Sequence, residues 1–147
     1  MGISPTALTM KFLRRSGYLV DVVERWVPRA NIRRDLFGIG DLLAVTMDEP
    51  PLLVQCTSLA NVSARVAKAQ TCQGLAVWLR TGSRFQVFGW AKGRGGLWHP
   101  KIVELKGVDM APDVLSRPPR RSRSRYRQGA DLFAGIVAGT VGPDGFR

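Results

Sequence analysis

The chain has 147 residues, enough for one compact domain with a hydrophobic core and too few for two comfortable ones. Its apolar fraction of 45% excludes a wholly disordered chain, and no apolar run reaches the roughly 18 residues that a membrane-spanning helix needs. The net charge of +11 indicates a polyanionic partner, with nucleic acid favoured over an anionic membrane surface.

The first quarter of the chain predicts a helix followed by a strand. Residues Thr6–Ser16 separate apolar from basic side chains at helical spacing, with Ser4 as the cap and Gly17 as the stop. The segment Tyr18–Val27 is rich in β-branched and aromatic residues, so we expect one strand that Pro28 closes. The tryptophans are expected in the core or covering the sheet: Trp26, Trp78, Trp90 and Trp98.

Two further strands are expected around a turn in the middle of the chain. The runs Leu42–Val45 and Leu52–Ser58 form these strands, because the turn Met47–Pro51 contains acids and prolines that interrupt a ladder. Asp41 follows Gly-Ile-Gly at the start of the second strand, where a buried acid is costly unless it has a function. If the two strands are neighbours, Asp41 can lie near Gln55 at one end of the sheet.

The rest of the body predicts a second helix and two more strands. The helix runs from Asn61 towards Leu79, with Gly74 as a candidate break, and the strands cover Phe85–Trp90 and Lys101–Leu105. The order of helix, three strands, helix and two strands predicts an α/β domain over residues 1–110.

Residues 111–147 are expected to form a flexible basic tail. The arginine-serine tract Pro112–Gln128 cannot bury enough apolar surface to fold alone. The segment Asp131–Val141 is apolar and short, either a docking helix or disordered. The arginines of the tail are expected to contact phosphates without reading base sequence: Arg120, Arg121, Arg123, Arg125 and Arg127.

Cysteine usage indicates an intracellular compartment. Cys56 and Cys72 lie in apolar segments, and the amino terminus carries no secretory signal, so we expect reduced thiols in a cytoplasmic protein. A zinc site formed by the two cysteines and His99 is rejected, because it lacks a fourth ligand and any paired spacing.

The element order, together with Asp41 and Gln55, resembles the PD-(D/E)xK nuclease superfamily, which includes restriction-endonuclease-like and Holliday-junction-resolvase-like enzymes. In that family an Asp on the second strand and an acid or Gln on the third bind magnesium, and a Lys two residues later orients or activates the water. Asp41 and Gln55 match the first two positions, whereas Thr57 stands where the Lys is expected. The resemblance covers Thr6 to Leu105 and implies a restriction-endonuclease-like core, with a mixed sheet flanked by helices.

The resemblance implies Mg²⁺ or Mn²⁺ as the cofactor, and the side chains suit such an ion. Mg²⁺ takes oxygen ligands and needs only one or two carboxylates besides water and phosphate, which Asp41 and Gln55 can provide. Glu24 is the candidate for a second carboxylate ligand, and Asp35 is its rival. A cation held there would polarise a phosphodiester and lower the pKa of a bound water.

The lysine that the family uses has no counterpart at Thr57, which can only donate a hydroxyl hydrogen bond. A positive charge near the metal stabilises the phosphate as negative charge accumulates on it. Lys68, on the following helix, is our first substitute, and Arg65 is the second. Lysine migration onto this helix occurs in the superfamily, which is why the helix is considered at all.

These observations lead to a hypothesis of a divalent-metal-dependent DNA endonuclease, encoded by a phage or mobile element. Duplex or branched DNA is favoured over RNA, and a homodimer is compatible, since many enzymes of this class cut both strands as dimers. Candidate contacts in the body are Arg33, Arg34 and Arg65. Two alternatives stay open: an inactive nuclease-like protein that only binds nucleic acid, and an interaction protein whose tail binds RNA or an acidic partner.

Each site residue also has a purely structural interpretation. Asp41 can be a strand-entry acid that pairs with Arg33 or Arg34, and Gln55 can satisfy backbone groups at the end of the sheet. Glu24 can be an exposed acid paired with Arg25 or with an arginine across the sheet.

Overall fold

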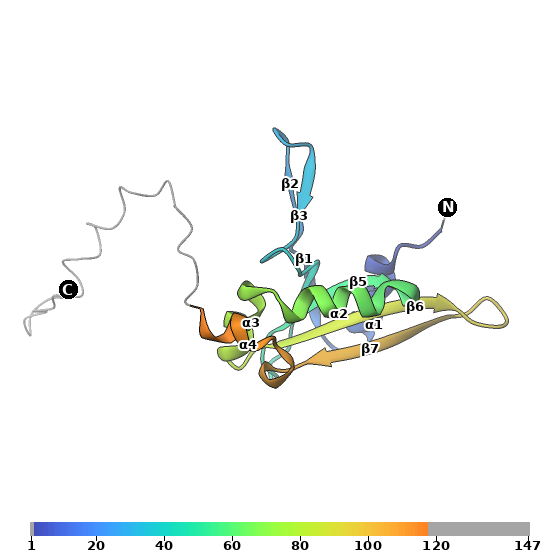
Figure 1. Ribbon diagram of the computed structural model, residues 1–147. Coiled ribbons are helices and arrows are strands. Elements are labelled where there is room, and N and C mark those ends of the chain that lie inside the picture. Colours follow the sequence, from blue (N-terminus) through green and yellow to red (C-terminus); the bar gives the residue numbers. More distant parts are fainter. Residues whose placement is uncertain (1, 118–147) are drawn as a thin grey trace, which may run out of the picture.

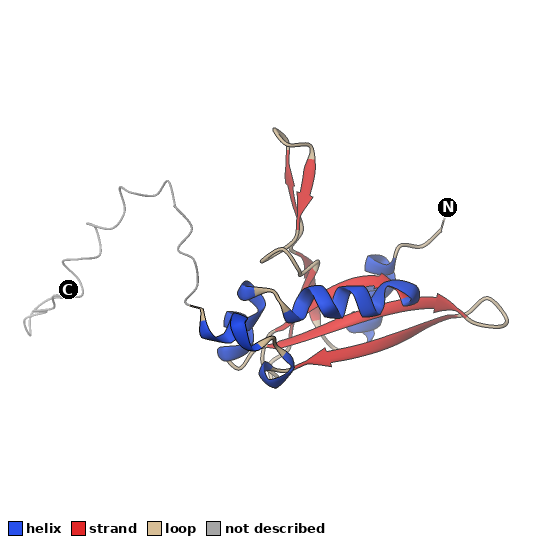
Figure 2. Ribbon diagram, in the orientation of Figure 1, coloured by secondary structure: helices blue, strands red, loops and turns tan. Residues whose placement is uncertain are grey.

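The computed structural model describes residues 2–117, which form a five-stranded mixed sheet with helices on both faces (Figure 1 and Figure 2). The first half comprises α1 (Pro5–Arg15), β1 (Leu19–Val22), β2 (Arg25–Val27), β3 (Ile32–Arg34), β4 (Leu42–Val45) and β5 (Leu52–Ser58). The second half comprises the 3-10 turn η1 (Leu59–Asn61), α2 (Val62–Gln70), α3 (Gln73–Arg80), β6 (Arg84–Lys92), β7 (Trp98–Leu105), the 3-10 turn η2 (Gly107–Asp109) and α4 (Pro112–Ser116).

The large sheet has the strand order β1-β4-β5-β6-β7. Neighbouring strands are antiparallel except β5 and β6, which are parallel because α2 and α3 carry the chain back between them. The chain is therefore an α/β protein with a mixed sheet, as the sequence predicted. Within residues 2–117, no helix has the length and apolar composition to cross a membrane.

Two hydrophobic clusters hold the helices to the sheet. Alternate residues of β5 point to opposite faces, so Leu53 belongs to the cluster under α2 and α3, whereas Val54 belongs to the cluster under α1. On the α1 side, the indole N–H of Trp90 donates a 2.8 Å hydrogen bond to the buried hydroxyl of Thr9. Because β5 is buried on both faces, any polar side chain on it requires a reason.

The segment predicted as one strand, Tyr18–Val27, is divided between two sheets, so that prediction was wrong. β1 ends at Val22, and β2 pairs with β3 in a separate two-stranded hairpin that projects from the body (Figure 1). Its turn closes through Asn31, which adopts a φ of 51°, a left-handed conformation that asparagine tolerates. Both β1 and β2 consist of residues that favour strands. They differ in their partners, because β1 pairs with β4 and β2 pairs with β3.

The predicted helix over Asn61–Leu79 is also divided, at Thr71 and Cys72 and not at Gly74. Gly74 has a packing function, because a Cβ added there would lie 2.7 Å from the Cβ of Phe37. Phe37 adopts a φ of 56° in the turn before β4 and contacts the ring of Trp78 on α3. Because Gly74 has no side chain, the turn that precedes β4 can pack directly against α3.

The folded part of the chain extends beyond the predicted boundary at residue 110. Pro112–Ser116, expected to belong to an unfolded tract, forms α4, whose Val114 is buried in the cluster under α3. The Arg80 side chain donates a 2.9 Å hydrogen bond to the carbonyl of Leu115. Arg120, Arg121, Arg123, Arg125, Arg127 and the segment Asp131–Val141 lie outside the described residues.

Substituting Gly40 should destabilise the fold, because this glycine packs directly on the core. A Cβ at Gly40 would lie 2.3 Å from Cδ1 of the fully buried Leu53. We expect Gly40→Ala to lower the free energy of unfolding by about 1–3 kcal/mol, the usual cost of overpacking. Gly107→Ala is the matched control, since a Cβ there meets nothing within 4 Å. Equal midpoints of chemical denaturation for Gly40→Ala and Gly107→Ala would contradict the packing at Gly40.

Candidate active site

The backbone fixes Asp41 between two strands at one end of the large sheet. Its N–H donates a 2.9 Å hydrogen bond to the carbonyl of Val54, and its own carbonyl accepts a 3.0 Å bond from the N–H of Val23. Just before it, Leu36 and Gly40 exchange two backbone hydrogen bonds that close a tight turn. The Gly-Ile-Gly-Asp segment therefore delivers Asp41 to the sheet in one position.

Asp41 and Gln55 are directly bonded to each other. The Nε2 atom of Gln55 donates a 2.5 Å hydrogen bond to Oδ2 of Asp41. The same oxygen accepts a 2.8 Å bond from the backbone N–H of Cys56. The pairing of Leu42 with Val54 places Asp41 opposite Gln55 on the face of the sheet that α2 covers. The structure thus brings together the two residues on which the sequence hypothesis depends.

The amide of Gln55 has one buried oxygen without a partner. Gln55 is 2% exposed, and within the described residues its Oε1 accepts no hydrogen bond. A buried polar atom without a partner is costly and rare in folded proteins. A neutral amide oxygen next to a carboxylate is a donor set that suits a hard cation retaining most of its water. Asp41 and Gln55 therefore carry oxygen atoms of the type that Mg²⁺ takes, and in this structure the Nε2 atom of Gln55 is the one that faces the carboxylate.

The environment of Asp41 disfavours its charged form. Burial raises the pKa of Asp41 to about 6, and the charges of Asp35 and Glu24 also raise it. The Cys56 N–H and the charge of Arg65 act in the opposite direction. A carboxylate with a raised pKa at the edge of a charged surface is typical of functional sites, and a nearby cation would offset the penalty.

The negative charges of Glu24 and Asp35 raise the pKa of Asp41, but the two acids do not form a group of metal ligands with it. Within residues 2–117, no group of three acids, histidines or cysteines is placed to hold a metal ion. Glu24 forms a 3.3 Å ion pair with Arg33 of the hairpin. This pairing agrees with the structural interpretation of Glu24 as an acid paired with an arginine. Its function as a second ligand stays a prediction.

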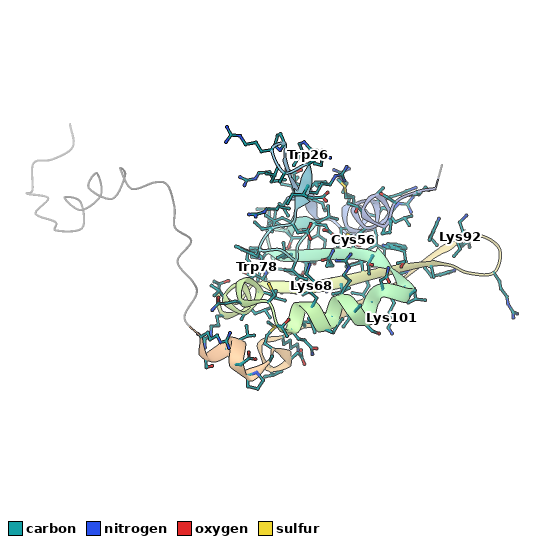
Figure 3. All side chains as sticks on the ribbon, turned by 45° about the horizontal axis from the view of Figure 1, so that its top comes forward. Trp26, Cys56, Lys68, Trp78, Lys92 and Lys101 are labelled. Atoms are coloured by element: carbon teal, nitrogen blue, oxygen red, sulfur yellow. The ribbon has the colours of Figure 1, made fainter. Side chains whose placement is uncertain are left out.

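The two candidates for the missing lysine occupy different places. Among the cations, Arg65 does most to lower the pKa of Asp41, so its charge is the one that the carboxylate senses. Lys68 is exposed and lines a shallow hollow of about 470 Å³, together with Arg33, Arg34 and Asp35. Figure 3 shows Lys68 near α2 and Trp26 on the hairpin at the top of the view. Electrostatics therefore favours Arg65 over Lys68 as the cation that acts on Asp41, and Lys68 lines the hollow.

Thr57 lies one pleat beyond Gln55 on the same face of β5 and is 6% exposed. A lysine there would start from a buried position and extend along the sheet. The threonine leaves this position without a charge.

No family model matches the chain, and the curated proteins and the solved structures that were searched give no match either. Family membership therefore stays a proposal based on the site itself.

Sequence reasoning missed two features near this site. One is the Cys56 N–H, a backbone donor that no side-chain pattern reveals. The other is the projecting hairpin, whose Trp26 was assigned to the core or sheet cover and is in fact 50% exposed. The Pro-Arg-Ala-Asn segment, flanked by two short apolar stretches, is the turn signal that could have identified the hairpin.

Proposed function

We propose that the chain is a divalent-metal-dependent nuclease that hydrolyses phosphodiester bonds in DNA. The observation that supports it most is the Asp41–Gln55 pair, with its 2.5 Å bond, its raised carboxylate pKa and its unpartnered buried Oε1. The carboxylate satisfies the Cys56 N–H, but its buried charge and the unpartnered Oε1 cost stability, and a ligand that uses both would offset that cost. The restriction-endonuclease-like assignment belongs to the same proposal.

In this proposal each residue has a defined task. The Cys56 N–H and the Gln55 amide hold the Asp41 carboxylate in one orientation, and the carboxylate is ionised above about pH 6. Mg²⁺, when bound by Asp41 and Gln55, supplies Lewis-acid polarisation of the phosphodiester and a water of lowered pKa. The guanidinium of Arg65 offsets the negative charge that accumulates on the phosphate.

The hollow beside the site suits a phosphate backbone. Arg33, Arg34 and Lys68 line it, and Asp35 is the acid among its lining residues. Only Arg33 of these cations has an ion pair among the described residues, with Glu24 at 3.3 Å. Cations without protein partners gain most from phosphate contacts, which would guide the scissile strand towards Asp41.

The second candidate function is nucleic-acid binding without catalysis. The uncharged Thr57 and the absence of a three-acid cluster among the described residues favour it. Both candidates require DNA binding, so cleavage separates them.

The test is metal-dependent cleavage of supercoiled plasmid and of branched DNA by the purified full chain. We expect cutting with Mg²⁺ or Mn²⁺, none with chelator, and none by Asp41→Ala prepared in parallel. Salt-sensitive DNA binding should survive in that variant. Cutting by Asp41→Ala would remove the proposed site, and binding without cutting by the wild type would establish the second candidate.

Removing the basic tail should weaken DNA binding equally for all sequences. The truncation belongs after Arg117, because an earlier one would remove part of α4 and its buried Val114. The five arginines between residues 120 and 127 are expected to release counterions, so their loss should flatten the plot of log affinity against log salt by up to about 0.9 per contact. Fluorescence anisotropy over a salt series measures this slope, and an unchanged slope would contradict the prediction.

A further inference from the structure

The β2–β3 hairpin exposes an aromatic side chain that the core does not use. Trp26 is 50% exposed and Ile32 is 45% exposed, although tryptophan is the side chain with the most apolar surface to bury. The hairpin forms its own two-stranded sheet and stands apart from the large sheet and its helices, as Figure 3 shows for Trp26. A two-stranded hairpin of this size is marginally stable alone, so an exposed tryptophan does little for its folding.

The charge of the hairpin points to a polyanion as the occupant of this surface. The segment 25–34 contains four arginines and no acid: Arg25, Arg29, Arg33 and Arg34. All four residues are exposed. Among the described residues, Arg33 forms an ion pair with Glu24. The other three arginines form no ion pair there and can contact a ligand. A second copy of this chain would bring the same positive charge to the interface, which disfavours self-association through the hairpin.

The register places the tryptophan next to arginines that line the hollow. Arg25 pairs with Arg34, and Trp26 pairs with Arg33, so Trp26 lies one residue step, about 3.4 Å, farther along the hairpin than the Arg25–Arg34 pair. Arg33 and Arg34 line the hollow beside the Asp41 site. Trp26 and Arg33 share one face of the hairpin, and Arg25 and Arg34 share the other. A nucleotide strand whose phosphate contacts Arg33 therefore brings a base to the level of the indole.

We propose that the β2–β3 hairpin is a binding arm that stacks Trp26 on an unpaired base of DNA while its arginines contact the flanking phosphates. Aromatic stacking beside a basic track is the usual way to bind unpaired nucleotides without reading their sequence. A base inside an intact duplex has both faces covered by its neighbours and offers the indole no surface. The substrate of the proposed nuclease is thus DNA with an unpaired stretch next to the cleavage position.

This inference rests on the proposed function for its choice of DNA, but it is tested by binding alone, with chelator present. Wild type, Trp26→Ala, Trp26→Phe and Ile32→Ala are titrated with a fluorescent single-stranded oligonucleotide and with its duplex. We expect Trp26→Ala to lose about tenfold in affinity for the single strand, with little change for the duplex. Trp26→Phe should retain most of the affinity. Ile32→Ala is the matched control, because it removes exposed apolar surface from the same hairpin without removing a ring.

The outcomes separate this inference from its rivals. Equal losses on single strand and duplex in Trp26→Ala would mean that the indole supports binding without stacking on an unpaired base. An unchanged affinity would remove Trp26 from the interface. Either result overturns the proposal. A dimer that Trp26→Ala converts to a monomer, with DNA binding unchanged, would overturn it in favour of self-association. Quenching of 2-aminopurine placed in the oligonucleotide, lost in Trp26→Ala, supports stacking directly. Because no step needs cleavage, an inactive protein that stacks DNA would refute the proposed function and leave this inference standing.

Discussion

The Asp41→Asn variant should unfold at a higher temperature than the wild type near pH 8, although it removes a candidate catalytic residue. The asparagine amide oxygen can accept the same two hydrogen bonds, from Gln55 Nε2 and from the Cys56 N–H. Only the charge, which burial disfavours, is lost. We expect a gain on the order of 1 kcal/mol, since partial exposure of the carboxylate screens part of the shift.

Asp41 affects stability in the direction opposite to that of most acids, whose folded-state pKa is lowered and whose charge stabilises the fold. The pKa of Asp41 is about 6 in the folded chain, above its ordinary value, so the folded state holds the proton more tightly than the unfolded state does. The wild type therefore loses stability as pH rises from the ordinary pKa of 3.8 to the folded-state pKa of about 6, and the loss is complete above about pH 6. The difference in melting temperature between wild type and Asp41→Asn should shrink as pH falls from about 6 and disappear below the ordinary pKa of 3.8, where Asp41 is protonated in both states.

Mg²⁺ provides the complementary measurement on the same pair of proteins. A ligand that binds only the folded state raises its stability, by about 2.7 kcal/mol at a hundred times the dissociation constant. We expect Mg²⁺ to raise the melting temperature of the wild type near pH 8 and to leave Asp41→Asn nearly unchanged. Lys11→Met, on the helix that covers the other face, controls for general salt effects. Equal shifts in wild type and Asp41→Asn would exclude Asp41 as a metal ligand.

The sequence predicted that Asp41 and Gln55 lie together because local rules determine their positions. The turn before Asp41 and the alternation along β5 are local patterns, and together they place Asp41 and Gln55 on one face. The choice between Arg65 and Lys68 was not predictable in this way. Both lie on α2, and which one the carboxylate senses depends on how that helix is rotated against the sheet.

The errors in the fold prediction have the same origin. The alternation in Tyr18–Val27 is continuous, yet the chain leaves the large sheet after Val22 and pairs with Ile32–Arg34. Strand propensity reports local preference and not the pairing partner. α4 was missed because five residues with one buried valine give no helical period. Both corrections matter for function, since one creates the hairpin and the other moves the boundary of the tail.

The Arg65→Met variant should lose about a hundredfold or more in cleavage rate, with a much smaller change in DNA affinity. The charge of Arg65 lowers the pKa of Asp41, so under the proposed function we expect it to act on a phosphate bound at that carboxylate. Removing one such group typically costs 10²–10³ in rate, about 3–4 kcal/mol. Lys68→Met should instead weaken binding, because Lys68 lines the hollow with Arg33 and Arg34. The reverse pattern would assign the catalytic charge to Lys68.

A lysine at position 57 should restore part of the lost rate. In the Arg65→Met background, Thr57→Lys returns a positive charge to the face of β5 that carries Gln55. Thr57→Met is the matched control, because methionine has similar length and no charge, and both substitutions overfill a position that is 6% exposed. Single-turnover cleavage should be at least about tenfold faster with lysine than with methionine, a difference worth about 1.4 kcal/mol. Equal rates in two folded variants would mean that a charge at this position does not reach the scissile phosphate. The Asp41–Gln55 pair would then require its cation from α2 alone.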